Sequence, residues 1–108
     1  MNYSVGDIVL VKFPFTDLKK SKKRPVLIVK GENERGDVVC FQITSNIEQS
    51  NLLKIQDKDL DKKKLSLKSY IKYDKCFTIN TSIVDKKIAK VKSSLLIELK
   101  LLFCDELF

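Results

Sequence analysis

The sequence predicts a small barrel of antiparallel strands with a helix packed on or beside it. Three observations support this fold class: the chain has only 108 residues, it contains several short apolar runs separated by turn-forming residues, and it ends in an amphipathic segment. A chain of this length has room for little more than one hydrophobic core. We therefore expect residues 1–108 to form one domain that is mainly β.

The first two strands are predicted from apolar runs. Residues 5–13 read V-G-D-I-V-L-V-K-F, and Pro14 ends this run because proline cannot continue a ladder. Asp7 is expected to fix the turn into the strand. Residues 26–30 read V-L-I-V-K, which is typical of a strand buried on both faces. The lysine-rich residues 16–23 predict a solvated loop between the two strands.

The middle of the chain predicts a hairpin, a short strand and a long strand. Residues 31–37 carry two glycines that supply positive φ in a hairpin loop, and residues 38–43 return as the third strand. Residues 52–55 follow a polar loop and predict a short strand. Residues 57–64 are too charged for the core and predict a solvated turn or a one-turn helix. Residues 70–79 alternate apolar and polar side chains, which predicts a long strand.

The last part of the chain predicts a closing strand and a helix. Residues 88–91 suit a short strand that closes the barrel. Ser93 or Ser94 is expected to cap the helix that follows. The helix is predicted from one apolar face at i, i+3, i+4 spacing, formed by Leu95, Leu96, Leu99, Leu102 and Phe103.

Composition excludes several kinds of chemistry. The chain has no histidine, which removes imidazole as an acid, base or metal ligand. Cys40, Cys76 and Cys104 are far apart, so we predict reduced, buried thiols rather than a zinc site or a disulfide framework. We expect no metal and no cofactor. No apolar run is long enough to span a membrane and the N-terminus lacks signal-peptide features, so we expect a cytoplasmic protein without a membrane partner.

The positive charge is concentrated in one segment. The chain has 21 Lys and Arg against 14 Asp and Glu, a net charge of +7. Residues 12–30 contain seven of these cations against the single acid Asp17, a net charge of +6. Such a segment attracts a polyanion such as nucleic acid, or an acidic protein. A solubilising loop explains the same charge equally well.

Arg24 and Thr44 are the candidates for chemistry. Only Arg24 and Arg35 break the preference of this chain for lysine, and only a guanidinium offers a planar fork of donors with a permanent charge. Arg24 stands where the basic loop meets a buried strand. Thr44 and Ser45 end the third strand with hydroxyls that can bond phosphate oxygens. Taken one at a time, these residues are more typical of ordinary strand ends, where hydroxyls satisfy nearby backbone groups, than of a reactive site.

As an ordered set, the motifs of the first half resemble the MazF/PemK family of toxins. They are G-D-I-V-L-V at residues 6–11, F-P-F-T-D at 13–17, R-P-V-L-I-V at 24–29 and I-T-S at 43–45. The second half resembles the family only in its order of elements. The resemblance implies an SH3-like, CcdB-like barrel with a C-terminal helix. It also implies a homodimeric toxin, a metal-independent endoribonuclease that cleaves single-stranded RNA and is held inactive by a cognate antitoxin.

The resemblance also implies roles for particular residues. The family's essential arginine and threonine fall on Arg24 and Thr44, which would stabilise the transition state while the RNA's own 2′-OH attacks. The products would be a 2′,3′-cyclic phosphate and a 5′-OH. Many relatives have glutamate, glutamine or glycine in the loop before R-P, whereas this chain has K-K-S-K-K, so those loop contacts do not transfer. We assign the RNA contacts of this chain to Lys19, Lys20, Lys22, Lys23, Thr16 and Ser45.

The expected partners follow from the same resemblance. An acidic antitoxin would lay a disordered C-terminal segment across residues 19–24. The homodimer would pair through barrel strands and the helix face of Leu95, Leu99, Leu102 and Phe103. Two other functions stay open. One is a noncatalytic RNA-binding barrel that uses the lysine loop with Tyr70, Tyr73 or Phe77, and the other is a CcdB-like gyrase poison that acts by protein contact.

Overall fold

A computed structural model describes residues 3–12, 23–61, 65 and 68–107 of the chain. The described residues form six strands and one α-helix, with short 3₁₀ turns at Asp57–Asp59 and Thr81–Ile83. The strands are β1 (Asp7–Lys12), β2 (Lys23–Lys30), β3 (Asp37–Thr44), β4 (Leu52–Ile55), β5 (Ser69–Asn80) and β6 (Val84–Lys90), and the helix is α1 (Ser93–Leu107). The predicted fold class, mainly antiparallel β with a C-terminal helix, is confirmed.

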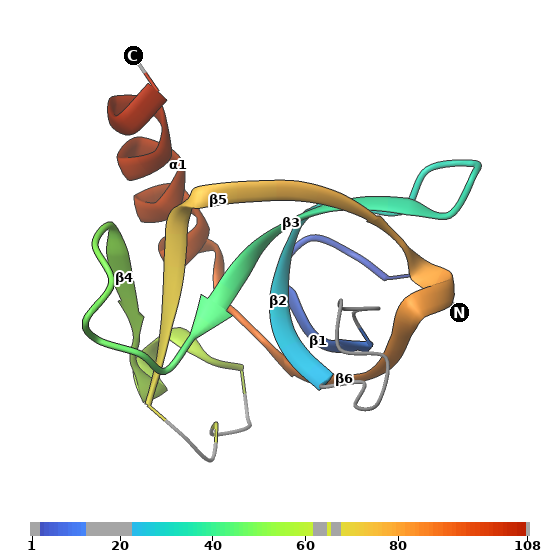
Figure 1. The fold of residues 1–108 in the computed structure, drawn as a ribbon, viewed down its shortest axis with the longest axis horizontal. Helices are drawn as coiled ribbons and strands as arrows, with labels where there is room; N and C mark the ends of the chain where they lie inside the picture. Colours follow the sequence, from blue (N-terminus) through green and yellow to red (C-terminus); the bar gives the residue numbers. More distant parts are fainter. Residues whose placement is uncertain (1–2, 13–22, 62–64, 66–67, 108) are drawn as a thin grey trace.

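The strands form one antiparallel sheet in the order β4-β5-β3-β2-β1-β6. Among the described strands β4 and β6 stay at the two edges, so the sheet curls into a barrel-like shape without closing (Figure 1). β5 arches across β3, and its pairing with β3 shifts register between Phe41 and Ile43. This irregularity interrupts the simple alternation that the sequence predicts for residues 70–79.

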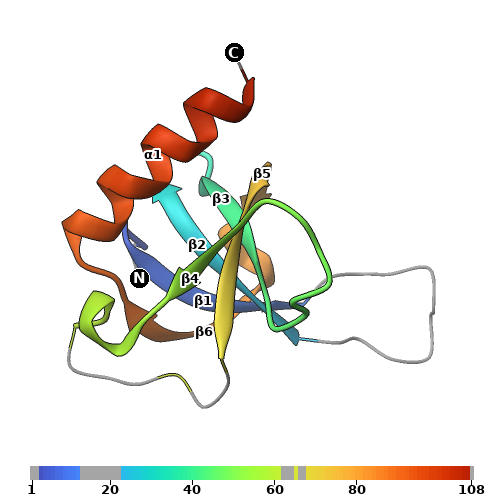
Figure 2. The same ribbon diagram turned by 90° about the vertical axis from the view of Figure 1, so that its left-hand side faces the viewer.

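The sheet is buried on both faces, and each face has its own apolar cluster. In β2, Val26 and Ile28 join the cluster inside the curl, whereas Leu27 joins a second cluster that faces α1. Figure 2 shows α1 lying along that side of the sheet. Burying one such side chain contributes about 1.5–3 kcal/mol. The prediction of a strand buried on both faces is confirmed.

α1 packs through part of its predicted apolar face. Leu95 and Leu99 are buried, and the ring of Phe103 meets Phe41 edge to face with 5.1 Å between the ring centroids. The predicted cap is wrong, because the helix already begins at Ser93 and both serines lie in its first turn. Among the described residues, no helix is long and apolar enough to span a membrane.

The segment after β4 is more buried than its charge predicts. Asp59 is only 8% exposed, and its carboxylate accepts a hydrogen bond from the backbone N–H of Gln56 at 2.8 Å. Leu60 belongs to the core cluster that faces α1. The prediction that residues 57–64 stay outside the core is therefore wrong for these two positions, since a satisfied carboxylate can be buried. Residues 62–64 lie outside the described residues.

Three further predictions are corrected in part. Gly36 has the expected positive φ of 81° in the hairpin, but Gly31 does not adopt a positive φ. Cys40 is a buried thiol, and burial raises its pKa to about 12, whereas Cys76 and Cys104 are free thiols on the surface. Cys104 lies on the solvent side of α1, whereas Cys76 of β5 pairs with Phe41 and lies at the surface beside α1. β6 begins earlier than predicted, at Val84.

Candidate active site

A cavity of about 360 Å³ opens where β2 and β3 separate at one end of the sheet. The two strands are paired as far as Val26 and Gln42. The preceding residue of β2, Pro25, has no N–H to donate to a ladder. The cavity is lined by Lys23, Arg24, Pro25, Ile43, Thr44, Ser45 and Ser69. Four of the residues predicted from the sequence therefore line one cavity, which we call the Arg24–Thr44 cavity.

Arg24 reaches this cavity from the second residue of β2. Its backbone pairs with Val11 of β1, a fully buried core residue, while the arginine itself is exposed. The strand therefore holds the base of the side chain and leaves its head accessible. A guanidinium held in this way can donate parallel hydrogen bonds to two oxygens of one phosphate group.

Thr44 enters the cavity from the last residue of β3. Its hydroxyl oxygen accepts a hydrogen bond from the backbone N–H of Asn46 at 3.1 Å. A hydroxyl that accepts one hydrogen bond can still donate its own proton. The hydrogen bond to a nearby backbone group that is expected of an ordinary strand-end hydroxyl is therefore present. The same hydrogen bond orients the Thr44 hydroxyl as a donor. Cα pairing places Tyr70 of β5 beside Thr44.

The predicted lysine and serine contacts have different surroundings. Ser45 is exposed beside Thr44. Lys23 forms an ion pair of 3.0 Å with Asp85 of β6, so part of its charge is already compensated. The hydrogen bond from Lys23 lowers the pKa of Asp85 below its ordinary value, with smaller contributions from the charges of Lys12 and Lys86. Thr16, Lys19, Lys20 and Lys22 lie outside the described residues.

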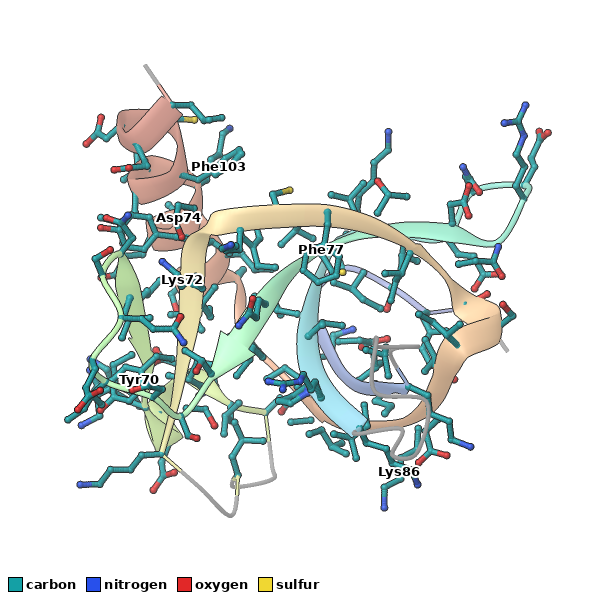
Figure 3. The ribbon with its side chains drawn as sticks, in the orientation of Figure 1. Tyr70, Lys72, Asp74, Phe77, Lys86 and Phe103 are labelled. Atoms are coloured by element: carbon teal, nitrogen blue, oxygen red, sulfur yellow. The ribbon has the colours of Figure 1, made fainter. Side chains whose placement is uncertain are left out.

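The loop that leaves Thr44 is fastened at its far end by Lys72, which sequence reasoning missed. Lys72 is only 7% exposed, and its ammonium group donates to the carbonyl oxygen of Ser50 at 2.7 Å. It also pairs with the carboxylate of Asp74 at 2.8 Å. Asn51, at a φ of 59°, donates from its amide to the same carboxylate at 3.0 Å. These contacts hold residues 45–51 against β5, where Figure 3 shows Lys72 and Asp74 one after the other along the strand.

No sequence signal distinguishes Lys72 from the other lysines of the chain. It occupies a polar position in an alternating strand, which ordinarily predicts exposure. Its burial arises because the loop of residues 45–51 folds over it, and that contact is nonlocal. Lys72 and Asn51 lower the pKa of Asp74 below its ordinary value, mainly through the hydrogen bond that Lys72 donates.

The three aromatic residues considered for RNA stacking do not share one surface. Tyr73 packs against the cluster that faces α1, and Phe77 packs against the cluster inside the curl. Only Tyr70 lies next to the Arg24–Thr44 cavity, as the Cα partner of Thr44. In Figure 3 Tyr70 and Phe77 stand at well separated positions along β5. Within the described part of the chain, no group of three or more Cys, Asp or Glu residues could hold a metal ion.

Comparison with known proteins gives a family and a fold. The family model described as PemK-like, MazF-like toxin of type II toxin-antitoxin system matches residues 4–105. No curated protein sequence matches the chain significantly.

Solved structures share the fold at low sequence identity. MazF from Deinococcus radiodurans has a TM-score of 0.76 at 16% identity, covering 99% of this chain and 97% of that one. A MazE–MazF complex from the same organism gives 0.79 at 15% identity, with 97% and 95% covered. An endoribonuclease in complex with its cognate antitoxin from Mycobacterial species gives 0.73 at 15% identity, with 97% and 92% covered.

Proposed function

Because the chain belongs to the family of PemK-like, MazF-like toxins of type II toxin–antitoxin systems, we propose that it is an endoribonuclease that cleaves single-stranded RNA without a metal ion. The observation that carries this proposal is the shared cavity of Arg24 and Thr44, two residues that are 20 positions apart in the sequence. A protein of known structure with this fold is itself described as an endoribonuclease.

The reaction uses a nucleophile that RNA brings with it. The 2′-oxygen attacks the adjacent phosphorus, forming the O2′–P bond, and the P–O5′ bond breaks. The 2′-OH gives up its proton, and the departing 5′-oxygen takes one up. The products are a 2′,3′-cyclic phosphate and a 5′-OH. The protein has to hold the attacking and leaving oxygens in line and to stabilise the extra negative charge on the phosphate oxygens.

Arg24 and Thr44 suit these tasks unequally. A guanidinium stays protonated throughout the physiological pH range, so Arg24 acts by donating hydrogen bonds to the nonbridging oxygens rather than by taking the proton. The Thr44 hydroxyl, whose oxygen is already engaged by Asn46, donates its proton to the same phosphate or aligns the attacking oxygen. Ser45 and Lys23 at the rim contribute contacts to the flanking backbone. We assign the same role to Thr16, Lys19, Lys20 and Lys22.

The proposal includes a homodimer and an acidic antitoxin as partners. Structures with this fold include complexes of MazF with MazE and of an endoribonuclease with its antitoxin. An anionic, partly apolar peptide would compensate the net charge of +6 on residues 12–30 and would occupy the space that RNA needs. Co-expression of such an antitoxin should restore growth to cells that express the toxin.

Incubating a long RNA with the purified protein in EDTA tests the proposed reaction. We expect fragments whose 5′ ends accept phosphate from a kinase without prior phosphatase treatment, and whose 3′ ends are cyclic phosphates. RNA that is bound but left intact would favour the noncatalytic RNA-binding barrel. Intact RNA together with inhibition of DNA gyrase would favour the gyrase poison. Fragments with 5′-phosphates would contradict attack by the 2′-OH.

A further inference from the structure

A second cavity lies next to the Arg24–Thr44 cavity and is lined by lysines. It has a volume of about 530 Å³ and is lined by Lys54, Ile55, Gln56, Asp57, Lys58, Leu60, Leu65 and Lys68. Three lysines against one aspartate give this lining a net positive charge. We call it the lysine cavity. The two cavities adjoin at the start of β5, because Lys68 lines one and Ser69 lines the other.

The lysines of this cavity differ in their surroundings from the lysines that form ion pairs on the same molecule. Lys23, Lys72 and Lys87 each form an ion pair with an aspartate. Within the described part of the chain, none of Lys54, Lys58 and Lys68 forms an ion pair with a carboxylate. All three lysines are exposed. Their charge is therefore not compensated locally. Three uncompensated ammonium groups around one hollow attract an anion with more than one charge.

The floor of the lysine cavity is fixed by the core. Ile55 and Leu60 are buried in the cluster that faces α1. The turn of residues 57–59 is tied to the junction of β6 and α1, since Lys92 N–H donates to the carbonyl of Asp59 at 2.7 Å and Asp61 N–H donates to that of Lys90 at 2.8 Å. The cavity is thus carried by backbone that packs against the rest of the molecule.

Tyr70 is paired with one lining residue of each cavity, although its own side chain belongs to neither lining. It is the Cα partner of Thr44 on one side and of Lys54 on the other. In antiparallel pairing, directly opposite residues project to the same face of the sheet, so the three residues form a row across β3, β5 and β4. Figure 3 shows Tyr70 near the start of β5 on the side of β4. Two strand spacings, or ~10 Å, separate the ends of the row, a distance that a short run of nucleotides covers.

From this arrangement we propose that single-stranded RNA leaves the Arg24–Thr44 cavity across Tyr70 and enters the lysine cavity, where Lys54, Lys58 and Lys68 bind the backbone phosphates next to the cleaved one. Tyr70 stacks on the intervening base. Aromatic rings serve this purpose in many single-strand binding proteins because every base has a π face. This inference rests on the proposed function for the identity of the ligand, but binding to the track does not require cleavage.

Equilibrium binding tests the lysine cavity separately from catalysis. The probe is a fluorescein-labelled single-stranded RNA of mixed sequence that carries 2′-O-methyl groups, so that it cannot be cut. The test variant is Lys54→Gln/Lys58→Gln/Lys68→Gln, and the matched control is Lys30→Gln/Lys75→Gln/Lys100→Gln, which removes the same charge from exposed positions elsewhere. Anisotropy is measured over a range of salt concentrations, and thermal unfolding verifies that both variants are folded.

We expect the test variant to lose about 10-fold in affinity at moderate salt, and the slope of log K against log salt to fall by about 2, as for three lost phosphate contacts on a single strand. The control should change the slope by less than half as much. Equal losses in the two variants would overturn the lysine cavity as a binding site.

A second pair of variants tests Tyr70: Tyr70→Phe should bind normally, and Tyr70→Leu, which keeps the bulk but not the ring, should lose about 5-fold or more in affinity. Equal binding by both would overturn the stacking role.

Turnover measurements separate this inference from the proposed function. With cleavable RNA, the lysine-cavity variant should raise KM while leaving kcat within about 2-fold, because its contacts are outside the reacting phosphate. If the wild-type protein binds the probe but cuts no RNA, the proposed function fails, and the anisotropy results alone decide the lysine cavity. If it cuts RNA and the lysine-cavity variant binds like the wild type, the inference fails and the proposed function stands.

Discussion

The two arginines of this chain carry the same guanidinium group but lie at different positions in the fold. Arg24 lies on β2 at the cavity, with its backbone anchored against the buried Val11. Arg35 is exposed in the hairpin between β2 and β3, at the opposite end of these strands, where its backbone carbonyl accepts a hydrogen bond from Asn80. A guanidinium stabilises a transition state only if it is held where negative charge develops. Position rather than residue type therefore makes Arg24 the candidate.

Thr44 should contribute less than Arg24, because it offers one neutral hydroxyl instead of a charged fork. Removing a single neutral hydrogen bond costs about 0.5–1.5 kcal/mol, so Thr44→Ala should slow single-turnover cleavage by roughly 2- to 13-fold. Thr44→Ser keeps the hydroxyl and should recover most of the rate. The control is Thr78→Ala. Thr78 is exposed and lies towards the end of β5, whereas Thr44 pairs near the start of that strand. Equal rates for Thr44→Ala and Thr78→Ala would remove Thr44 from the mechanism.

At the scale of elements, the loop between β3 and β4 depends on one buried cation. Lys72 satisfies the carbonyl of Ser50 and the carboxylate of Asp74, and these groups would lose a partner if its ammonium were absent. Lys72→Met should therefore lower the free energy of unfolding by about 1–3 kcal/mol. Lys75→Met, at an exposed position on the same strand, should change it by less than about 0.5 kcal/mol. Urea denaturation measures both; similar values would show that Lys72 does not fasten the loop.

The pair formed by Lys72 and Asp74 also predicts a pH dependence. The pKa of Asp74 is lowered in the folded state, so the stability it contributes is present above the pKa of an unfolded aspartate, near 3.9, and is lost as the pH falls through the folded value. Asp74→Asn should be less stable than the wild type at pH 7, and the difference should shrink below about pH 4. A difference that stays constant from pH 7 to pH 3 would be inconsistent with this linkage.

The elements were predictable to different degrees, for physical reasons. β2 was predictable from an apolar run that is bounded by proline and charged residues. β4 was predictable from a short apolar run that follows a polar loop. The burial of Asp59 and Lys72 could not be predicted from local patterns. The carboxylate of Asp59 accepts a local hydrogen bond from Gln56, but its turn is held against the molecule by the distant Lys92, whose N–H donates to the Asp59 carbonyl. Lys72 is buried because the loop that contains Ser50 folds over it. The cavity was predictable only in part. Motif resemblance suggested Arg24 and Thr44, but the separation of β2 from β3 and the lysine cavity are tertiary features.

At the scale of the whole molecule, the expected homodimer would need a different surface from the one that the helix pattern suggests. Leu95 and Leu99 are each only 2% exposed because they fill the core of their own chain, so they cannot meet a partner. Ile97 and Leu101 are 62% and 64% exposed on the other side of α1. Exposed apolar side chains of this size are common at subunit contacts, although single ones are ordinary on a surface.

The expected homodimer can be checked by sedimentation equilibrium at micromolar concentration. We expect a species of twice the chain mass of 12.4 kDa. If the contact uses the exposed side of α1, Ile97→Lys/Leu101→Lys should shift the protein towards monomer, whereas Lys30→Gln should not. A wild-type protein that sediments as a clean monomer would contradict the dimer.

Single-turnover cleavage in EDTA by arginine variants tests most directly whether the Arg24–Thr44 cavity cleaves RNA. Arg24→Ala should lose about 10²-fold or more in rate, by analogy with the loss of an oxyanion-hole donor. Arg24→Lys keeps the charge but loses the fork and should stay clearly impaired. Arg35→Ala should cut like the wild type. Wild-type rates for Arg24→Ala, or equal losses for Arg24→Ala and Arg35→Ala, would contradict cleavage at this cavity.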